Sequence, residues 1–160
     1  MPTTTRPDLT AAALASLAAA VVALAIRISE PFEHDAWLVA YLFLVGFLAQ
    51  LLLSRGQAAL LAAAGLPAPT PDARLAQALA WNLGVIAVPA GVLAETRLAV
   101  VVGSVSLLTA LAFFAKTARP VLPGSAVRPG RLGWAYAHLL LIMTASTLIG
   151  TALAWDIPWT

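Results

Sequence analysis

The feature that most constrains this chain is a series of apolar runs, each long enough to cross a lipid bilayer. A helix needs roughly 20 mostly apolar residues to span a hydrocarbon core of about 30 Å. Five runs meet this requirement, at residues 9–28, 36–53, 75–94, 98–115 and 132–155. The sequence therefore predicts an all-α integral membrane bundle of five transmembrane helices, which form one domain over residues 1–160.

The amino-acid composition supports this prediction and excludes several classes of protein. Hydrophobic residues make up 61% of the chain and charged residues 10%, whereas a soluble domain is about half apolar and about a quarter charged. The nine Lys and Arg and the seven Asp and Glu residues are too few to cover a soluble globule of this size. A soluble enzyme, a disordered chain and a nucleic-acid-binding module are thereby excluded. The absence of Cys excludes disulfides, thiolate metal ligands and cysteine nucleophiles.

Charged and proline-rich segments mark the ends of the spans. Residues 95–97 (Glu-Thr-Arg) interrupt what would otherwise be a helix of about 60 Å, twice the hydrocarbon thickness, so we expect a tight hairpin there. Residues 57–66 are too short to span a bilayer. They indicate either a helical extension of the second span or an interfacial segment broken at Gly56. Asp72, which follows a Pro-rich connector, is predicted to cap the third span.

The basic residues predict the orientation. With five spans, seven of the nine basic residues fall on one side of the membrane: Arg6, Arg55, Arg74, Lys116, Arg119, Arg128 and Arg131. Only Arg27 and Arg97 fall on the other side, together with most of the acidic residues. Cytoplasmic loops carry an excess of Lys and Arg. We therefore expect a multi-pass protein of the cytoplasmic (inner) membrane, with its N-terminus in the cytoplasm and its C-terminus outside.

Polar side chains within the spans gather in the half of the bundle nearer the cytoplasm. No Asp, Glu, Lys or Arg lies in the middle of a span, but Gln50, Asn82, Thr109 and His138 lie one to two turns from the cytoplasmic ends of their helices, at a depth similar to that of Trp81. If their helices are neighbours, the four polar side chains form a hydrogen-bonded layer, in which each bond contributes about 0.6 kcal/mol and sets the register. With Trp81, they are also a candidate binding site for haem, a quinone or a lipid headgroup.

The two histidines do not predict a shared cofactor. His34 is expected at the outer surface and His138 near the inner one, so they cannot ligate one haem within one subunit. A haem held by His138 alone, or completed by another subunit, stays open, but no cofactor is predicted. Glu30, Glu33 and His34 offer ligands for a divalent metal. A solvated acidic loop explains the same residues, so no metal site is predicted.

Small residues spaced by four recur along several spans, and such ridges let helix backbones approach closely. The ridges are Ala12, Ser16 and Ala20; Ala76, Ala80 and Gly84; and Ser146, Gly150 and Ala154. Together with the scarcity of ionisable and catalytic side chains within the spans, these ridges favour a non-catalytic membrane subunit. Such a subunit packs against other subunits or copies of itself. A membrane ligand-binding protein is the first alternative. A small-solute transporter or channel is the second, although the spans lack charged residues along a pathway.

Overall fold

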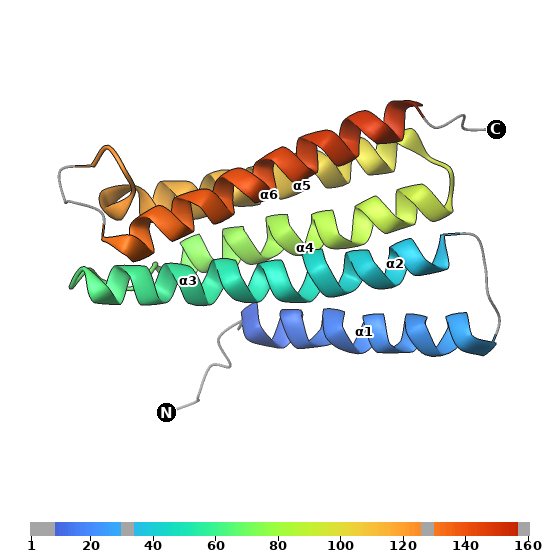
Figure 1. The fold of residues 1–160 in the computed structure, drawn as a ribbon, viewed down its shortest axis with the longest axis horizontal. Coiled ribbons are helices and arrows are strands. Elements are labelled where there is room, and N and C mark those ends of the chain that lie inside the picture. The colour runs from blue at the N-terminus through green and yellow to red at the C-terminus, as the bar shows by residue number, and fades with distance from the viewer. Residues whose placement is uncertain (1–8, 30–33, 126–129, 157–160) are drawn as a thin grey trace.

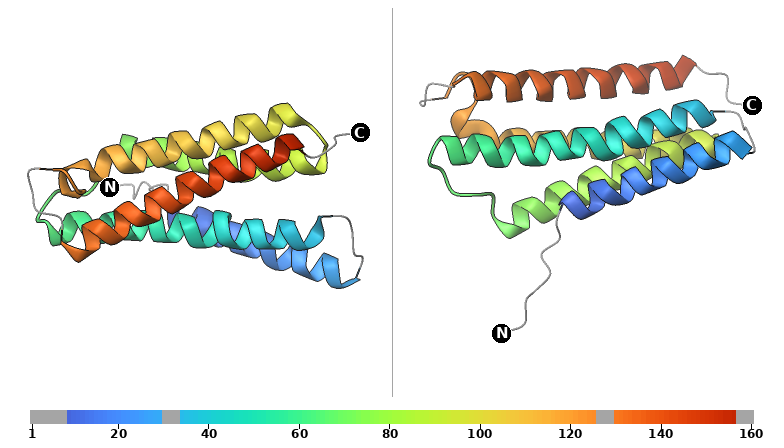
Figure 2. Two further views of the ribbon diagram at one scale, coloured as in Figure 1. Left: turned by 45° about the horizontal axis from the view of Figure 1, so that its top comes forward. Right: turned by 60° about the horizontal axis from the view of Figure 1, so that its bottom comes forward.

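The chain forms an all-helical bundle. The computed structural model describes the backbone of residues 9–29, 34–125 and 130–156, and the side chains of residues 12–28, 34–125 and 130–152. Within these ranges there is no strand, and the long helices lie side by side along one axis (Figures 1 and 2). The elements are α1 (Leu9–Ser29), α2 (Asp35–Tyr41), η1 (Leu42–Ala49), α3 (Gln50–Ala63), α4 (Pro71–Leu93), α5 (Arg97–Ala118), η2 (Arg119–Val121) and α6 (Arg131–Asp156). Since α2, η1 and α3 form one continuous helix, the all-α prediction of five long helices is confirmed.

Four of the helices are long and apolar enough to cross a membrane. They are Asp35–Ala63, Pro71–Leu93, Arg97–Val121 and Arg131–Ala152. The first helix, α1, has 21 residues, of which the described apolar part covers Ala12–Ile28 and is shorter. The chain is therefore a multi-pass membrane protein by the length and apolar character of its helices, and the fifth span, α1, stays a prediction.

The second span is longer than its apolar core, residues 36–53. It continues through Gly56 to Ala63, so the interpretation of residues 57–66 as a helical extension is confirmed. Gly56 does not break the helix. A Cβ atom at this position would lie 3.1 Å from the ring of Tyr136, and the glycine therefore serves close packing against α6. The helix has 29 residues, which is about 44 Å at ~1.5 Å per residue and exceeds a hydrocarbon core of about 30 Å.

This long helix ends in a glycine cap. Gly65 has φ 66°, a left-handed conformation that glycine adopts without steric cost. The Leu66 N–H donates to the Leu61 carbonyl at 2.9 Å, and the Gly65 N–H donates to the Ala62 carbonyl at 3.0 Å. These two bonds satisfy carbonyls that a helix end otherwise leaves free.

The predicted cap of the third span is wrong by two residues. Thr70 rather than Asp72 is the cap, because the Thr70 hydroxyl accepts a hydrogen bond from the Ala73 N–H at 3.2 Å. Pro71 follows at the first helical position, where its missing N–H removes no helical bond. Asp72 lies in the first turn, where its charge interacts favourably with the positive end of the helix dipole.

The hairpin predicted at residues 95–97 is confirmed. Glu95 has φ 51°, and the Thr96 N–H donates to the Gly91 carbonyl at 2.8 Å, so the chain reverses within a few residues. From this turn, α4 and α5 pack against each other more extensively than any other pair of elements. A Cβ atom at Gly91 would lie 2.6 Å from the Val100 nitrogen, and one at Gly103 would lie 2.7 Å from the Val88 nitrogen. Glycine at these positions therefore permits backbone-to-backbone contact.

The second helix contains a π-helical segment, η1, where it meets α1 and α4. Such segments are rare and mostly last a single turn, and this one covers eight residues. Gly46 is buried within it, and a Cβ atom there would lie 2.8 Å from Ser16 Cβ on α1 and 3.2 Å from Val85 Cγ1 on α4. These contacts fix the level of η1 against both neighbours. Arg27 Nε and Asp35 Oδ1, 3.4 Å apart, join the last turn of α1 to the start of α2.

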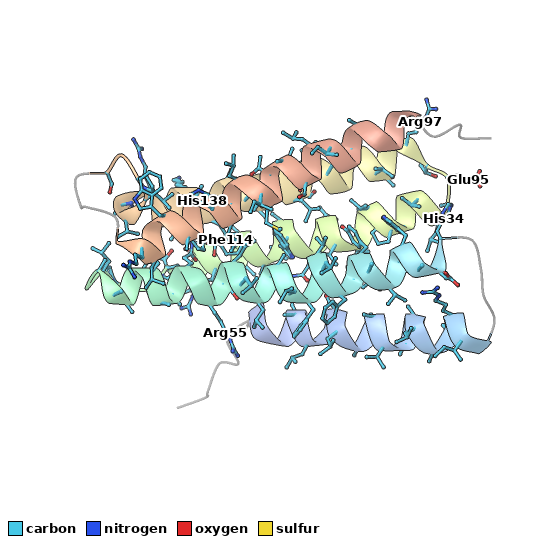
Figure 3. The ribbon with its side chains drawn as sticks, in the orientation of Figure 1. His34, Arg55, Glu95, Arg97, Phe114 and His138 are labelled. Atoms are coloured by element: carbon cyan, nitrogen blue, oxygen red, sulfur yellow. The ribbon has the colours of Figure 1, made fainter. Side chains whose placement is uncertain are left out.

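The described charged residues lie at the two ends of the bundle. The end that contains the α4–α5 turn, here called the hairpin end, carries His34, Glu95 and Arg97 (Figure 3). The opposite end, formed by the end of α3, the start of α4, the end of α5 and the start of α6, is here called the connector end (Figure 1). The basic residues on this side of the bundle are Arg74, Lys116, Arg119 and Arg131, together with Arg55, which lies about two turns before the end of α3 (Figure 3). The positions of the helices therefore reproduce the sorting of charge that the sequence predicts.

The close α4–α5 contact predicts a sharp sensitivity to one methyl group. Gly103→Ala should lower the free energy of unfolding by about 1–3 kcal/mol, because the added methyl meets the Val88 backbone. Unfolding is measured by titration with a denaturing detergent at a dilution where the chain is monomeric. The matched control is Gly150→Ala, because no described atom beyond its own helix backbone lies within 4 Å of a Cβ at Gly150. A gain of about 0.5–1 kcal/mol is expected there, because alanine favours the helix over glycine, and equal losses in the two variants would contradict this account of the packing.

Candidate functional site

A buried polar cluster lies inside the bundle and is built by α3 and α4. We define it as Gln50, Gln57, Gln77 and Trp81, whose exposed fractions are 0%, 2%, 0% and 1%. Apolar residues of α3 and α5, including Leu53, Leu107, Leu111 and Phe114, belong to the core that contains Trp81. Polar groups shielded in this way from water depend on partners inside the protein.

Two members of the cluster tie their helices to α5. Gln57 Nε2 donates to the Phe114 carbonyl at 3.2 Å, and Gln77 Nε2 donates to the neighbouring Phe113 carbonyl at 3.4 Å and to Thr117 Oγ1 at 3.3 Å. The Trp81 ring meets the Phe114 ring edge to face, with centroids 6.3 Å apart. Consecutive carbonyls of α5 thus hold α3 and α4 at one level of the bundle.

Two tyrosines make similar bonds between helices. The Tyr41 hydroxyl donates to the Gly84 carbonyl at 3.3 Å and joins the second helix to α4. The Tyr136 hydroxyl donates to the Leu53 carbonyl at 3.1 Å and joins α6 to α3. Since both acceptors are backbone carbonyls, these bonds position the helices and use the hydroxyl donors of both tyrosines.

Other polar atoms of the cluster have no hydrogen-bond partner among the residues that the structure describes. They are Gln50 Nε2, Gln50 Oε1, Gln77 Oε1 and Trp81 Nε1. A buried donor or acceptor left in this state costs about 1–3 kcal/mol. Such atoms are the clearest sign of a binding site within the described part of the chain.

The helix register places Gln50 and Trp81 at one level. Gly46 of η1 lies against Val85 of α4, and the two helices run in opposite directions. Gln50 follows Gly46 by one turn, and Trp81 precedes Val85 by one turn. Because four residues advance both helices toward the connector end by similar distances, Gln50 and Trp81 start from about the same level of the bundle.

The structure separates the other predicted site residues from this pair. Asn82 Nδ2 donates to the Ala78 carbonyl of its own helix at 2.8 Å. Thr109 is exposed, and its hydroxyl donates to the Val105 carbonyl of its own helix at 2.8 Å. His138 is also exposed, on the outside of α6, with Nδ1 2.7 Å from the Trp134 carbonyl (Figure 3).

The expected layer of Gln50, Asn82, Thr109 and His138 is therefore not formed within the chain. The prediction depended on depth alone, and depth does not determine which face of a helix turns inward. Gln57, in contrast, follows Gln50 by seven residues and so shares its helix face. That spacing identifies Gln57 once the second helix is known to continue past Gly56.

The residues considered as ligands for a metal or a haem are not brought together in the described part of the chain. His34 is exposed at the hairpin end, whereas Glu30 and Glu33 lie outside the described residues. In the described ranges, no group of three His, Cys, Asp or Glu side chains is placed to hold a metal ion. His34 and His138 lie toward opposite ends of the bundle (Figure 3), so one chain cannot place both on a single haem.

Comparisons with known proteins add no assignment. No protein-family model, no curated protein and no solved structure matches this chain. The function is therefore inferred from two features of the molecule, which are the buried polar cluster and the exposed face of α6.

The Tyr136 bond predicts a measurable loss of stability. Tyr136→Phe removes the hydroxyl that donates to the Leu53 carbonyl, and the free energy of unfolding should fall by about 0.5–1.5 kcal/mol. Thr109→Val is the control, because the Thr109 hydroxyl is exposed and bonds only within its own helix. Thermal unfolding in detergent, followed by circular dichroism, distinguishes them. If both variants unfold like the wild type, the Tyr136 bond does not stabilise the attachment of α6.

Proposed function

We propose that the chain is a non-catalytic, five-span subunit of the inner membrane, which assembles with copies of itself or with other membrane subunits through α6. The observation that carries this proposal is the exposure of α6 toward the hairpin end. Tyr136 and Leu140 are buried near the start of this helix, whereas none of the side chains from 141 to 152 is buried. About half of a long apolar helix is thus free to contact another helix.

Small residues make this half of α6 suitable for helix packing. Apolar side chains such as Ile142 and Ile149 are exposed there, but lipid tails cover apolar surface as well as a protein does. Close approach of a second backbone instead depends on small residues. Ser146 and Gly150 are both exposed on this helix, and the space around Gly150 is open.

The threonine hydroxyl groups on this half of α6 need no hydrogen bond from a partner. Thr144, Thr147 and Thr151 donate to carbonyls of their own helix at 2.8–2.9 Å. Their hydrogen-bonding capacity is therefore met without lipid or partner groups. A neutral face with small residues fits another transmembrane helix better than a charged or polar ligand.

The sorting of charge supports an orientation with the connector end in the cytoplasm. That end carries five of the described basic residues, whereas Arg27 and Arg97 lie at the hairpin end. The positive-inside rule assigns the basic end to the cytoplasm, which places the N-terminus inside and the C-terminus outside.

Two cysteine variants test the orientation, because the chain has no Cys of its own. Ala68 lies in the connector between α3 and α4, Ala94 lies in the hairpin turn, and both are exposed. Ala94→Cys should react with a membrane-impermeant maleimide on intact cells, whereas Ala68→Cys should react only after permeabilisation. The opposite pattern would reverse the proposed orientation.

Photo-crosslinking tests the assembly. A photoreactive amino acid in place of Ser146, in native membranes, should give a covalent protein adduct, because the exposed face of α6 contacts another helix. A copy of the chain gives twice its 16.5 kDa, and a different subunit gives another mass. Val105, exposed on α5, is the control position and should yield lipid adducts only. Lipid adducts alone at both positions would rule out assembly through this face.

The ligand-binding alternative is supported by fewer residues than the sequence predicts. Support is limited to Gln50 and Trp81, because His138 lies on the outside of α6 and Asn82 bonds within its own helix. A haem held by His138 therefore requires a second subunit to cover it. Transport of a small solute gains no support, because the predicted spans carry no charged residue at their middles.

A further inference from the structure

We infer that the buried polar cluster binds internal water between Gln50, Trp81 and Gln77. This inference is independent of the proposed assembly through α6, since it concerns the interior of α3, α4 and α5. It follows from the four unpartnered atoms of these three side chains, each of which is less than 2% exposed.

The chemistry of the four atoms matches water. The indole Nε1–H of Trp81 and the Gln50 amide Nε2 only donate hydrogen bonds, whereas the Oε1 atoms of Gln50 and Gln77 only accept them. Since none of these atoms bonds to another in the structure, a molecule that both donates and accepts hydrogen bonds can serve all of them. Water donates two hydrogen bonds and accepts two, and a buried water typically makes about three.

Direct bonds from Trp81 Nε1 to Gln50 Oε1 and from Gln50 Nε2 to Gln77 Oε1 would satisfy all four atoms, but neither bond is formed in the structure. The Gln77 amide Nε2 is already engaged by Phe113 and Thr117 of α5, which holds this side chain in place. In the arrangement that the structure shows, water between these side chains supplies the missing partners.

Hydroxyl-radical labelling by X-ray radiolysis tests the inference, because radicals form from bound water and oxidise the side chains beside it. The full chain is irradiated in lipid nanodiscs, and oxidation is located by mass spectrometry. Wild-type Trp81 should be oxidised although it is 1% exposed. In Gln50→Leu, which removes one donor and one acceptor, the rate at Trp81 should fall several-fold. Thr109→Val, on the exposed side of α5, should leave that rate unchanged.

Each outcome supports or overturns the inference. Unmodified Trp81 in the wild type means that the interior is dry, and this result decides the question even if Gln50→Leu does not fold. Equal oxidation of Trp81 in wild type and a folded Gln50→Leu variant overturns the role of Gln50. A small organic molecule released from the wild type in native mass spectrometry, and absent from the Gln50→Leu variant, would make that molecule the occupant in place of water.

Discussion

The close contact between α4 and α5 is the interaction on which the rest of the bundle depends. Lipid tails are as apolar as leucine, so helices in a membrane associate through close packing and hydrogen bonds rather than through expulsion of water. Gly91 and Gly103 supply that packing, because each places its backbone against the backbone of the opposite helix. The contact sets the level of α5 against α4, and it thereby brings the Phe113 and Phe114 carbonyls within reach of Gln77 and Gln57.

The remaining helices attach to this hairpin through a few specific contacts. Gln57 bonds the second helix to α5, and Tyr41 bonds it to α4. Gly46 sets the level of the second helix beside Val85. The attachment of α6 depends on Tyr136, which bonds to Leu53 and packs against Gly56 close to the connector end. Because no described side chain of α6 after Leu140 is buried, its second half remains exposed, and the proposed assembly face lies beyond this attachment.

The sequence predicted the helices better than the site, for a physical reason. Helix ends follow from local features, and the hairpin at Glu95 could be placed because two charges interrupt an apolar run that is too long for a bilayer. The sequence leaves the extension to Ala63 open because Arg55 and Gly56 resemble a span end, whereas Gly56 accommodates the ring of Tyr136. The site depends on helix rotation, which depth alone does not give, and so Gln50 faces the core while Thr109 faces outward.

The two proposals depend on what a bilayer does and does not tolerate. Exposed leucine and isoleucine on α6 do not require a partner, because lipid covers them, and the proposed assembly therefore depends on the small residues Ser146 and Gly150 in the exposed half of α6. Unpartnered polar atoms are different, because neither lipid nor apolar side chains can replace a hydrogen bond. The atoms of Gln50 and Trp81 therefore require a polar partner whether or not the chain assembles. Since the Gln50–Trp81 pair lies inside the bundle and Gly150 lies on its outside, loss of either property should leave the other intact.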